Sequence, residues 1–240
     1  MLSTVSTGPA QRVGRGGLAR DGVLVACAIL MLLTLYLVFL WVPTDANLGV
    51  SQRILYFHVP LAILSLISIV VVAIASAVHL ARKDERSDAI AYASAEVGIV
   101  FCTLAIVTGA IWAKPVWGVW WTWDPKLTLT LVLWFVYAAY MMLRAYGPKG
   151  SQGARYGSVL ALVGAIDAPI VYYAAELWRS THPSHVIGVS AESGSLPPEM
   201  AIGLIISLLA FSLLFTHLII ERYVLRRAET GVDEIFRSFT

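Results

Sequence analysis

The 240-residue chain is 58% hydrophobic and 13% charged, whereas a soluble domain is roughly half apolar and about one quarter charged. So few charges exclude an ordinary soluble domain and indicate a protein that lies in a bilayer, where a helix satisfies its own backbone hydrogen bonds. The net charge of +2 gives no support to a nucleic-acid-binding role. Cys27 and Cys102 stand alone inside apolar runs, so we interpret both as buried thiols.

Apolar runs of about twenty residues, each long enough to cross the hydrocarbon core of a bilayer, recur along the chain. In order, they predict spans at 22–42, 60–80, 89–113, 127–146, 157–175 and 199–220. The first run is too long for the apolar region of a cleaved signal peptide, so we expect it to remain as a span. The sequence therefore predicts an all-α integral membrane protein with six transmembrane helices. One membrane domain at 22–220 would lie between tails at 1–21 and 221–240.

Basic residues gather on one side of these predicted spans. That side holds both tails and the second and fourth connectors, with thirteen of the seventeen Lys and Arg residues. Because basic residues near short loops stay on the cytoplasmic side, we expect both termini in the cytoplasm. The connectors at 43–59, 114–126 and 176–198 then face outward. Only four cations lie on the outward side: Arg53, Lys114, Lys126 and Arg179.

The middle outward connector carries four tryptophans in the pattern WGxWWxWDxxLT over 117–128. Tryptophan is common at membrane interfaces, and Trp41, Trp112 and Trp178 fit such an aromatic belt. An aromatic belt needs only one or two rings at each helix end, so it does not explain four rings in one connector. A dense indole surface beside Gly118, where the backbone can approach closely, favours a platform for a flat, apolar ligand. The tryptophan segment, Trp117 to Asp124, supplies its rings: Trp117, Trp120, Trp121 and Trp123.

Three of the five histidines share the outward side with the tryptophan segment. His58 precedes the second predicted span, and His182 and His185 lie in the last outward connector. Imidazole is a frequent axial ligand of haem iron, and a porphyrin is flat and apolar, so two connectors can together supply a haem site. An interfacial histidine without any ligand is the alternative for each of them.

These residues resemble a known family, the haem-handling C protein of system I cytochrome c maturation (CcmC). The resemblance runs from Tyr56 to the last span and depends on WGxWWxWDxxLT flanked by an earlier and a later outward histidine. The motif is shared by a wider WWD family of haem-handling membrane proteins. Longer members of that family have many more spans, so the length of this chain favours the short member.

The resemblance implies a haem-binding site on the periplasmic face of the bacterial inner membrane. His58 and His182 would be the axial ligands of haem iron, and the tryptophan segment would contact the porphyrin. The cargo would be haem b, bound non-covalently and transiently. The family also implies three kinds of partner: a periplasmic, membrane-anchored haem chaperone that docks at the tryptophan segment, ABC transporter subunits and a small membrane subunit.

The outward cations are candidates for binding the two haem propionates. We include Arg53, Lys126 and Arg179 in the predicted site, with Lys114 as a further candidate. Lys126 stands where many members of the family have arginine, which leaves its role in propionate binding open. His185 is an alternate iron ligand or a solvated loop residue, and we favour the solvated loop residue.

The predicted function is delivery of haem to the chaperone, not enzymatic turnover, and the chain has no GxxxxGK[ST] phosphate-binding loop. One alternative is a haem-containing electron-transfer subunit, which would need deeper ligands such as His79 and His217. Another is a transporter of haem or another hydrophobic solute. Glu96 and Asp167 lie within spans, where an unpaired charge is costly, so packing and functional roles stay open for both.

Overall fold

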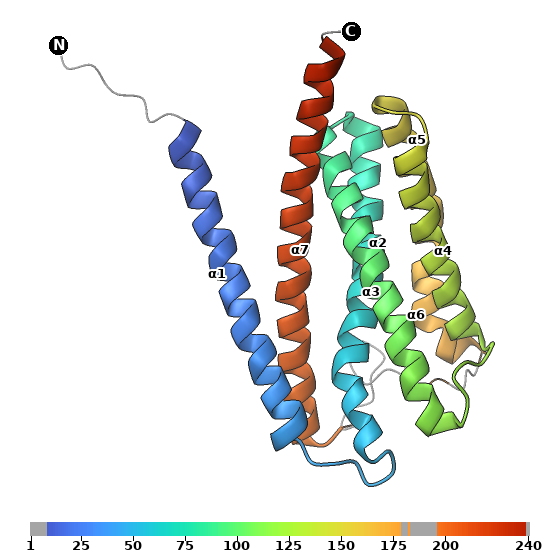
Figure 1. Cartoon of the computed structure of the whole chain (residues 1–240). Coiled ribbons are helices and arrows are strands. Elements are labelled where there is room, and N and C mark those ends of the chain that lie inside the picture. Colours follow the sequence, from blue (N-terminus) through green and yellow to red (C-terminus); the bar gives the residue numbers. More distant parts are fainter. Residues whose placement is uncertain (1–8, 179–181, 183–195, 239–240) are drawn as a thin grey trace, which may run out of the picture.

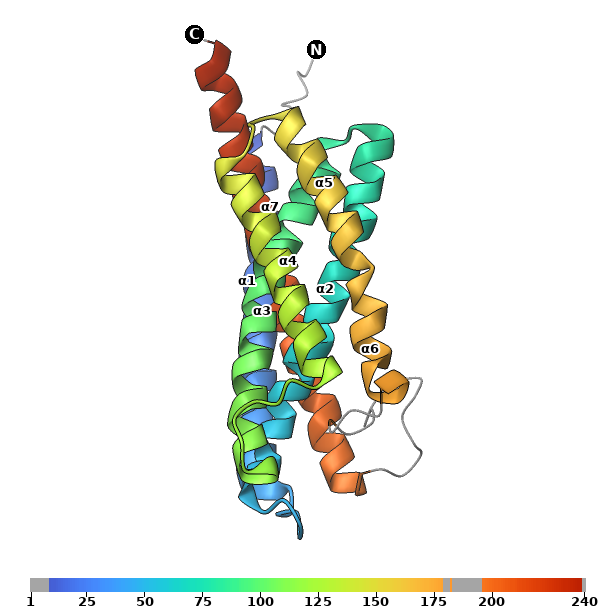
Figure 2. The same ribbon diagram turned by 90° about the vertical axis from the view of Figure 1, so that its right-hand side faces the viewer.

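The computed structural model describes residues 9–178, 182 and 196–238. In this part the chain forms a helical bundle (Figure 1 and Figure 2), and six segments are long and apolar enough to cross a membrane. The predicted all-α, six-span fold is therefore confirmed. Its helices are α1 (Pro9–Tyr36), α2 (Leu55–Arg82), α3 (Glu85–Trp117), α4 (Pro125–Tyr146), α5 (Ser151–Ala165), α6 (Asp167–Trp178) and α7 (Pro198–Ser238). A π-helical turn η1 (Leu37–Trp41) ends the first span, and a 3-10 turn η2 (Val50–Ile54) precedes α2.

The turns of the bundle lie at two opposite ends. The start of α1, the end of α7 and the α2–α3 and α4–α5 turns lie at one end (Figure 1), which we call the basic end. The loop between α3 and α4, residues 118–124, lies at the other, which we call the tryptophan end. Two caps fix the turns: Asp84 accepts hydrogen bonds from the amides of Arg86 and Ser87 at the start of α3, and Asp124 accepts one from Leu127 at the start of α4.

The cap at Asp84 has an electrostatic consequence. The Ser87 hydroxyl also donates to its carboxylate, at 2.7 Å. This hydroxyl and the amides of Arg86 and Ser87 hold the pKa of Asp84 below its usual value, because they stabilise the charged form.

Helix α2 starts earlier than predicted, with Pro60 inside it. A proline has no N–H, so the carbonyl of Tyr56, four residues earlier, loses its helical donor. The Ser207 hydroxyl of α7 donates to this carbonyl instead. Tyr56 is fully buried, so the bond satisfies an acceptor that water cannot reach and ties α2 to α7.

Proline also explains why the fifth span consists of two helices. α5 ends at Ala165 and α6 begins at Asp167, with Pro169 in its first turn. The proline ring cannot donate to the carbonyl of Ala165, so the helix breaks there. Oδ2 of Asp167, at this break, is buried without a hydrogen-bond partner in the described part of the chain.

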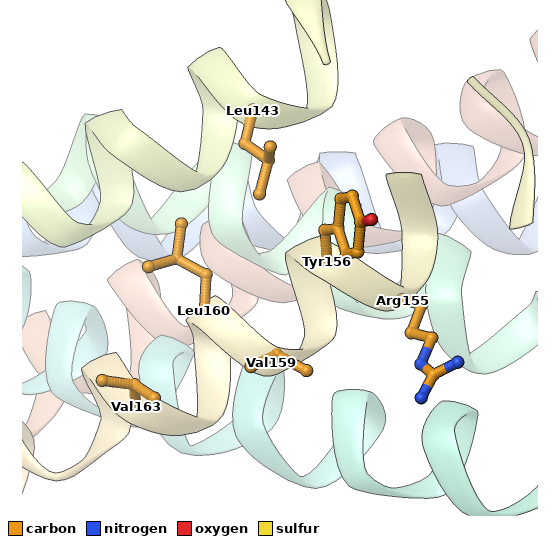
Figure 3. A pocket seen from close by; sticks show the side chains of 6 residues that line it. All are labelled: Leu143, Arg155, Tyr156, Val159, Leu160 and Val163. Carbon is orange, nitrogen blue, oxygen red and sulfur yellow. The ribbon is translucent and has the colours of Figure 1, made fainter. Parts of the chain in front are cut away.

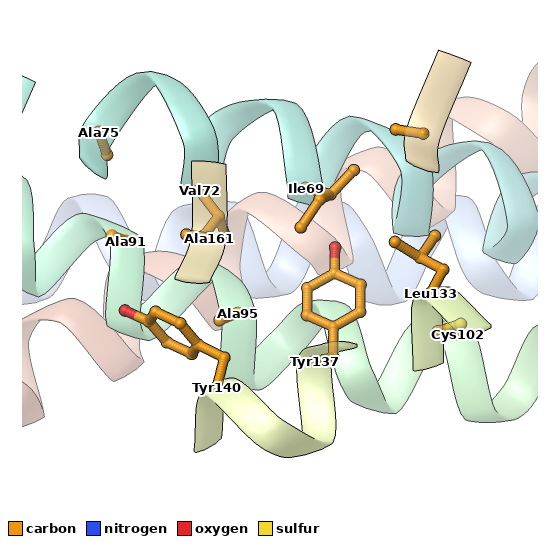
Figure 4. Packing of buried hydrophobic residues seen from close by; sticks show 11 residues of the cluster. Ile69, Val72, Ala75, Ala91, Ala95, Cys102, Leu133, Tyr137, Tyr140 and Ala161 are labelled. Carbon is orange, nitrogen blue, oxygen red and sulfur yellow. The ribbon is translucent and has the colours of Figure 1, made fainter. Parts of the chain in front are cut away.

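The core joins four of the spans. Tyr137 and Tyr140 point from α4 into a cluster with Ile69 and Val72 of α2 (Figure 4), and small side chains of α3 complete it. The Tyr137 hydroxyl donates to the carbonyl of Ser65 at 2.8 Å. A Cβ at Gly98 would lie 2.8 Å from the Tyr137 ring, so only glycine lets α3 approach this closely.

Ion pairs join helices toward the basic end. Arg144 of α4 binds both carboxylate oxygens of Asp88 of α3, and its side chain is only 5% exposed. Arg222 of α7 binds Glu96 of α3 at 2.6 Å. Glu96, whose role the sequence left open, is thus paired within the bundle.

The helices extend beyond the predicted spans. The connector expected at 43–59 ends where α2 begins at Leu55, and the one expected at 114–126 is shortened by the last turn of α3. The tails expected at 1–21 and 221–240 are largely helical, because α1 begins at Pro9 and α7 continues to Ser238. Hydropathy finds the apolar middle of a helix, whereas the helix itself continues as long as its backbone bonds and caps allow.

Candidate functional site

The tryptophan segment begins as helix and ends as a cap. Trp117 is the last residue of α3, and Gly118 ends the helix in the left-handed conformation, at φ 76°. The Lys114 ammonium donates to the carbonyl of Gly118 at 2.8 Å. Asp124 and Pro125 then form the N-cap and first position of α4, a pairing that suits a helix start.

The four rings of the segment are not equally exposed. Trp120 and Trp123 are 58% and 76% exposed, whereas Trp117 and Trp121 are half-buried. Trp121 and Trp123 pack edge to face, with ring centroids 5.9 Å apart. The indole N–H groups of Trp112 and Trp121 are buried and make no hydrogen bond within the described residues. The loop thus offers exposed indole rings, and Trp121 of the loop and Trp112 of α3 each keep an unused donor.

His58 lies in the first turns of α2, not in a connector, and its ring faces α3. Nδ1 is 3.1 Å from the carbonyl of Ala105 and 3.2 Å from the hydroxyl of Thr108. A carbonyl only accepts, so Nδ1 carries the proton, and in the neutral ring Nε2 keeps its lone pair. A histidine held this way is ready to bind a metal through Nε2.

Because Gly109 has no side chain, the imidazole of His58 has room to lie against α3. A Cβ there would lie 3.0 Å from Cε1 of His58 and 3.4 Å from Nδ1. The His58 ring also packs edge to face against Trp112, with centroids 5.9 Å apart. One face of α3, with Ala105, Thr108, Gly109 and Trp112, therefore orients the ring.

His182 lies beside the same end of α3. Its ring packs edge to face against Trp117, with centroids 6.3 Å apart, and it interacts electrostatically with His58. The structure therefore brings together the two predicted histidines and the first tryptophan of the segment, from three separate parts of the chain.

The predicted cations differ in their surroundings. Lys126 is half-buried in the first turn of α4 and interacts electrostatically with His58, Glu176 and Asp124. Arg53 instead donates to the carbonyl of Phe39 at 2.8 Å. Arg179 and His185 lie outside the described residues.

The two remaining histidines lie away from the tryptophan segment. His79 is buried near the end of α2, where its Nδ1 is 3.0 Å from the carbonyl of Asp84 and so closes the α2–α3 turn. His217 lies on α7, and its Nδ1 is buried without a hydrogen bond in the described part.

Comparison with known proteins adds independent information. Residues 12–233 match the protein family described as Heme exporter protein C. The chain belongs to this family. The match includes all six spans, the tryptophan segment, His58 and His182, and it confirms the resemblance found in the sequence.

Individual members of the Heme exporter protein C family are similar over most of their length. The one from Bradyrhizobium diazoefficiens is 37% identical over 194 residues, covering 80% of this chain and 73% of the relative. The one from Escherichia coli strain K12 is 36% identical over 185 residues, covering 77% and 74%. The one from Haemophilus influenzae is 34% identical over 181 residues, covering 75% and 73%.

Sequence reasoning missed the α3 residues that orient His58 in this Heme exporter protein C family member. Trp112 was assigned to a general aromatic belt, and Ala105, Thr108 and Gly109 were not singled out. Their spacing of three and four residues places them on one helical face that leads into the tryptophan segment. That spacing was the available signal, but no pattern indicated that α2 packs His58 against it.

Proposed function

We propose that this protein handles haem in cytochrome c biogenesis: it binds haem at the tryptophan end and delivers it to a haem chaperone. Membership of the Heme exporter protein C family supports the general role. The observation that carries the site is the grouping of His58, with Nε2 unprotonated, His182 and the tryptophan segment at one end of the bundle. The charge distribution supports a periplasmic position for this end and an inner-membrane location for the protein.

The chemistry of these residues fits haem. His58 and His182 supply two imidazoles for the iron, and the exposed rings of Trp120 and Trp123 supply an apolar surface for the porphyrin. A buried donor without a partner costs about 1–3 kcal/mol, so the N–H groups of Trp112 and Trp121 would be better satisfied by a ligand acceptor such as a propionate.

Lys126 is the cation that we assign to a propionate. It interacts electrostatically with His58, so it lies near the proposed iron site. Glu176 and Asp124 interact electrostatically with its ammonium group. A propionate would bind a lysine that these two carboxylates already hold in position. Arg53 and Lys114 are less available, because each donates to a backbone carbonyl.

Delivery requires haem that is held but not fixed. The proposed contacts are coordination by imidazole and packing against indole rings, so haem b would be bound non-covalently and would leave when the chaperone offers another ligand. Trp120 and Trp123 are the most exposed rings and would form the surface where the chaperone docks. ABC transporter subunits and a small membrane subunit, the partners implied by the family, would supply any energy for release.

The test is the absorption spectrum and haem content of protein purified from haem-producing cells, compared with His58→Ala and His182→Ala. His217→Ala is the matched control, because it removes a histidine of α7 that is remote from the tryptophan segment. We expect a bis-histidine spectrum in the native chain and the control, and a changed spectrum or lost haem in the two site variants. Unchanged haem in both site variants would overturn the assignment of the ligands.

A further inference from the structure

A groove on the outside of the bundle, between α4 and α5, plays no part in the proposed haem site. It has a volume of about 720 Å³, and its walls are Leu143, Arg155, Tyr156, Val159, Leu160 and Val163. Figure 3 shows Arg155 at one end of the row and Val163 at the other. The groove is open to the surroundings of the bundle, since Val159 and Val163 are 49% and 62% exposed.

Glycines explain why two helices meet beside this groove. A Cβ at Gly164 would clash with Val136 of α4, and one at Gly157 would lie 2.8 Å from Cδ of Arg144. At these two positions the side chains of Val136 and Arg144 lie directly against the backbone of α5. The exposed side chains of Tyr156, Val159 and Val163 form one wall of the groove.

The two ends of the groove differ in polarity. Arg155 is exposed and makes no ion pair within the described residues, whereas Arg144 and Arg222 at the same end of the bundle are paired with acids. The Tyr156 hydroxyl accepts a hydrogen bond from Gln152 at 3.0 Å, so its own proton is free to be donated. The other four residues of the walls are aliphatic, and the walls hold no carboxylate.

The dimensions fit one leaflet of a bilayer. Val163 lies eight residues after Arg155, which corresponds to a rise of about 12 Å along a helix. Half of a hydrocarbon core is about 15 Å thick. A molecule with its charge at Arg155 would therefore extend an apolar part along the groove through most of the leaflet.

We propose that this groove binds an anionic phospholipid at the basic end. Arg155 and Tyr156 hold the phosphate, and one acyl chain lies against Leu143, Leu160 and Val163. A net negative headgroup is preferred because the groove offers one cation and no acid to pair with the positive group of a zwitterionic lipid. The inference does not depend on the haem site, which lies at the opposite end.

The experiment is native mass spectrometry of the detergent-purified full chain, titrated with phosphatidylglycerol or phosphatidylcholine. Three variants are compared with the native protein. Arg155→Gln removes the charge of the groove, and Val163→Trp fills its apolar end. Arg82→Gln is the matched control, because Arg82 is also exposed at the basic end and makes no ion pair with a described residue, but lies on α2, outside the groove.

We expect phosphatidylglycerol to bind the native chain and Arg82→Gln roughly fivefold to tenfold more tightly than phosphatidylcholine, the effect of one cation near a headgroup. Arg155→Gln loses this preference, and Val163→Trp weakens both lipids. Equal preference in Arg155→Gln and Arg82→Gln overturns the phosphate site. Unchanged affinity in Val163→Trp overturns the acyl-chain site. Loss of copurified haem in Arg155→Gln with normal lipid binding would assign the groove to haem instead and also overturn the proposal.

Discussion

Gly109 gives the imidazole of His58 room to lie against α3. The Gly109→Val variant places a branched side chain where even a Cβ would be 3.0 Å from the ring. His58 must then turn away from Ala105 and lose the hydrogen bond that keeps Nε2 unprotonated. Because loss of an orienting partner of a metal-binding histidine costs about tenfold or more in affinity, we expect haem retention to fall by at least that factor.

The matched control for this change is Gly22→Val. A Cβ at Gly22 meets no atom within 4 Å, so the variant makes the same chemical change in open space on α1. Haem per chain and the Soret spectrum are measured for both, with thermal unfolding to show that each folds. Equal haem content in Gly109→Val and the native chain would show that Gly109 does not position an iron ligand.

Two substitutions of Asp124 can separate its role as the N-cap of α4 from a role in haem binding. Its carboxylate caps α4 by accepting a hydrogen bond from the amide of Leu127 at 3.0 Å. Asp124→Ala should lower stability by about 1 kcal/mol, and Asp124→Ser should retain most of it because serine is also a good N-cap. Thermal unfolding in detergent measures this difference. If serine restores stability but not haem content, the carboxylate also acts on haem or its neighbours.

These two residues show what the sequence could and could not predict about the site. The N-cap at Asp124 can be predicted from the sequence, because Asp-Pro before an apolar run is a local signal for a helix start. The contact between Gly109 and His58 was not, because it joins residues on different helices whose relative rotation is set by packing. The tryptophan segment was predicted from four tryptophans in one connector, and the histidines and Lys126 from their place in the outward connectors. The roles of His58 and His182 as iron ligands were implied by the family resemblance and stay a prediction.

At the scale of elements, the α2–α7 contact depends on a proline. Pro60 leaves the carbonyl of Tyr56 without its helical donor, and the Ser207 hydroxyl replaces that donor. Ser207→Ala would leave a buried acceptor unpaired, and we expect it to lower stability by about 1–3 kcal/mol. In a Pro60→Ala background the backbone N–H of residue 60 can bond to Tyr56, so the same serine change should cost much less.

A double-mutant cycle of these changes, followed by thermal or denaturant unfolding in detergent, measures the coupling. Thr216→Val is the control for losing a hydroxyl on α7, because the Thr216 hydroxyl bonds only within its own helix, to the carbonyl of Ser212. Equal costs of Ser207→Ala in both backgrounds would contradict the replacement of one donor by the other.

The same contact bears on a difference between the predicted and observed second span. The apolar run predicted a span that starts at residue 60. The structure starts at Leu55, because a hydroxyl from a helix far along the chain satisfies the carbonyl that the proline frees. Span number and approximate position followed from hydropathy alone, whereas this boundary depends on a tertiary contact.

At the scale of the whole molecule, charge separates the two ends of the bundle. The turns of the basic end hold Arg82, Lys83, Arg86 and Lys149, and the tryptophan end holds the proposed haem site. The positive-inside rule then predicts that the basic end lies in the cytoplasm. This orientation decides whether the tryptophan segment meets a periplasmic chaperone, so it is the premise on which the delivery role depends.

The chain is well suited to a direct test of orientation. Its two native cysteines, Cys27 and Cys102, are 5% and 0% exposed, so we expect the native protein to react poorly with a membrane-impermeant maleimide. Val119→Cys places a thiol in the α3–α4 loop, and Lys149→Cys places one in the α4–α5 turn. In intact spheroplasts we expect Val119→Cys to be labelled and Lys149→Cys to be labelled only after permeabilisation. The reverse pattern would put the tryptophan segment in the cytoplasm, where a periplasmic chaperone could not reach it, while leaving the geometry of His58 and α3 unchanged.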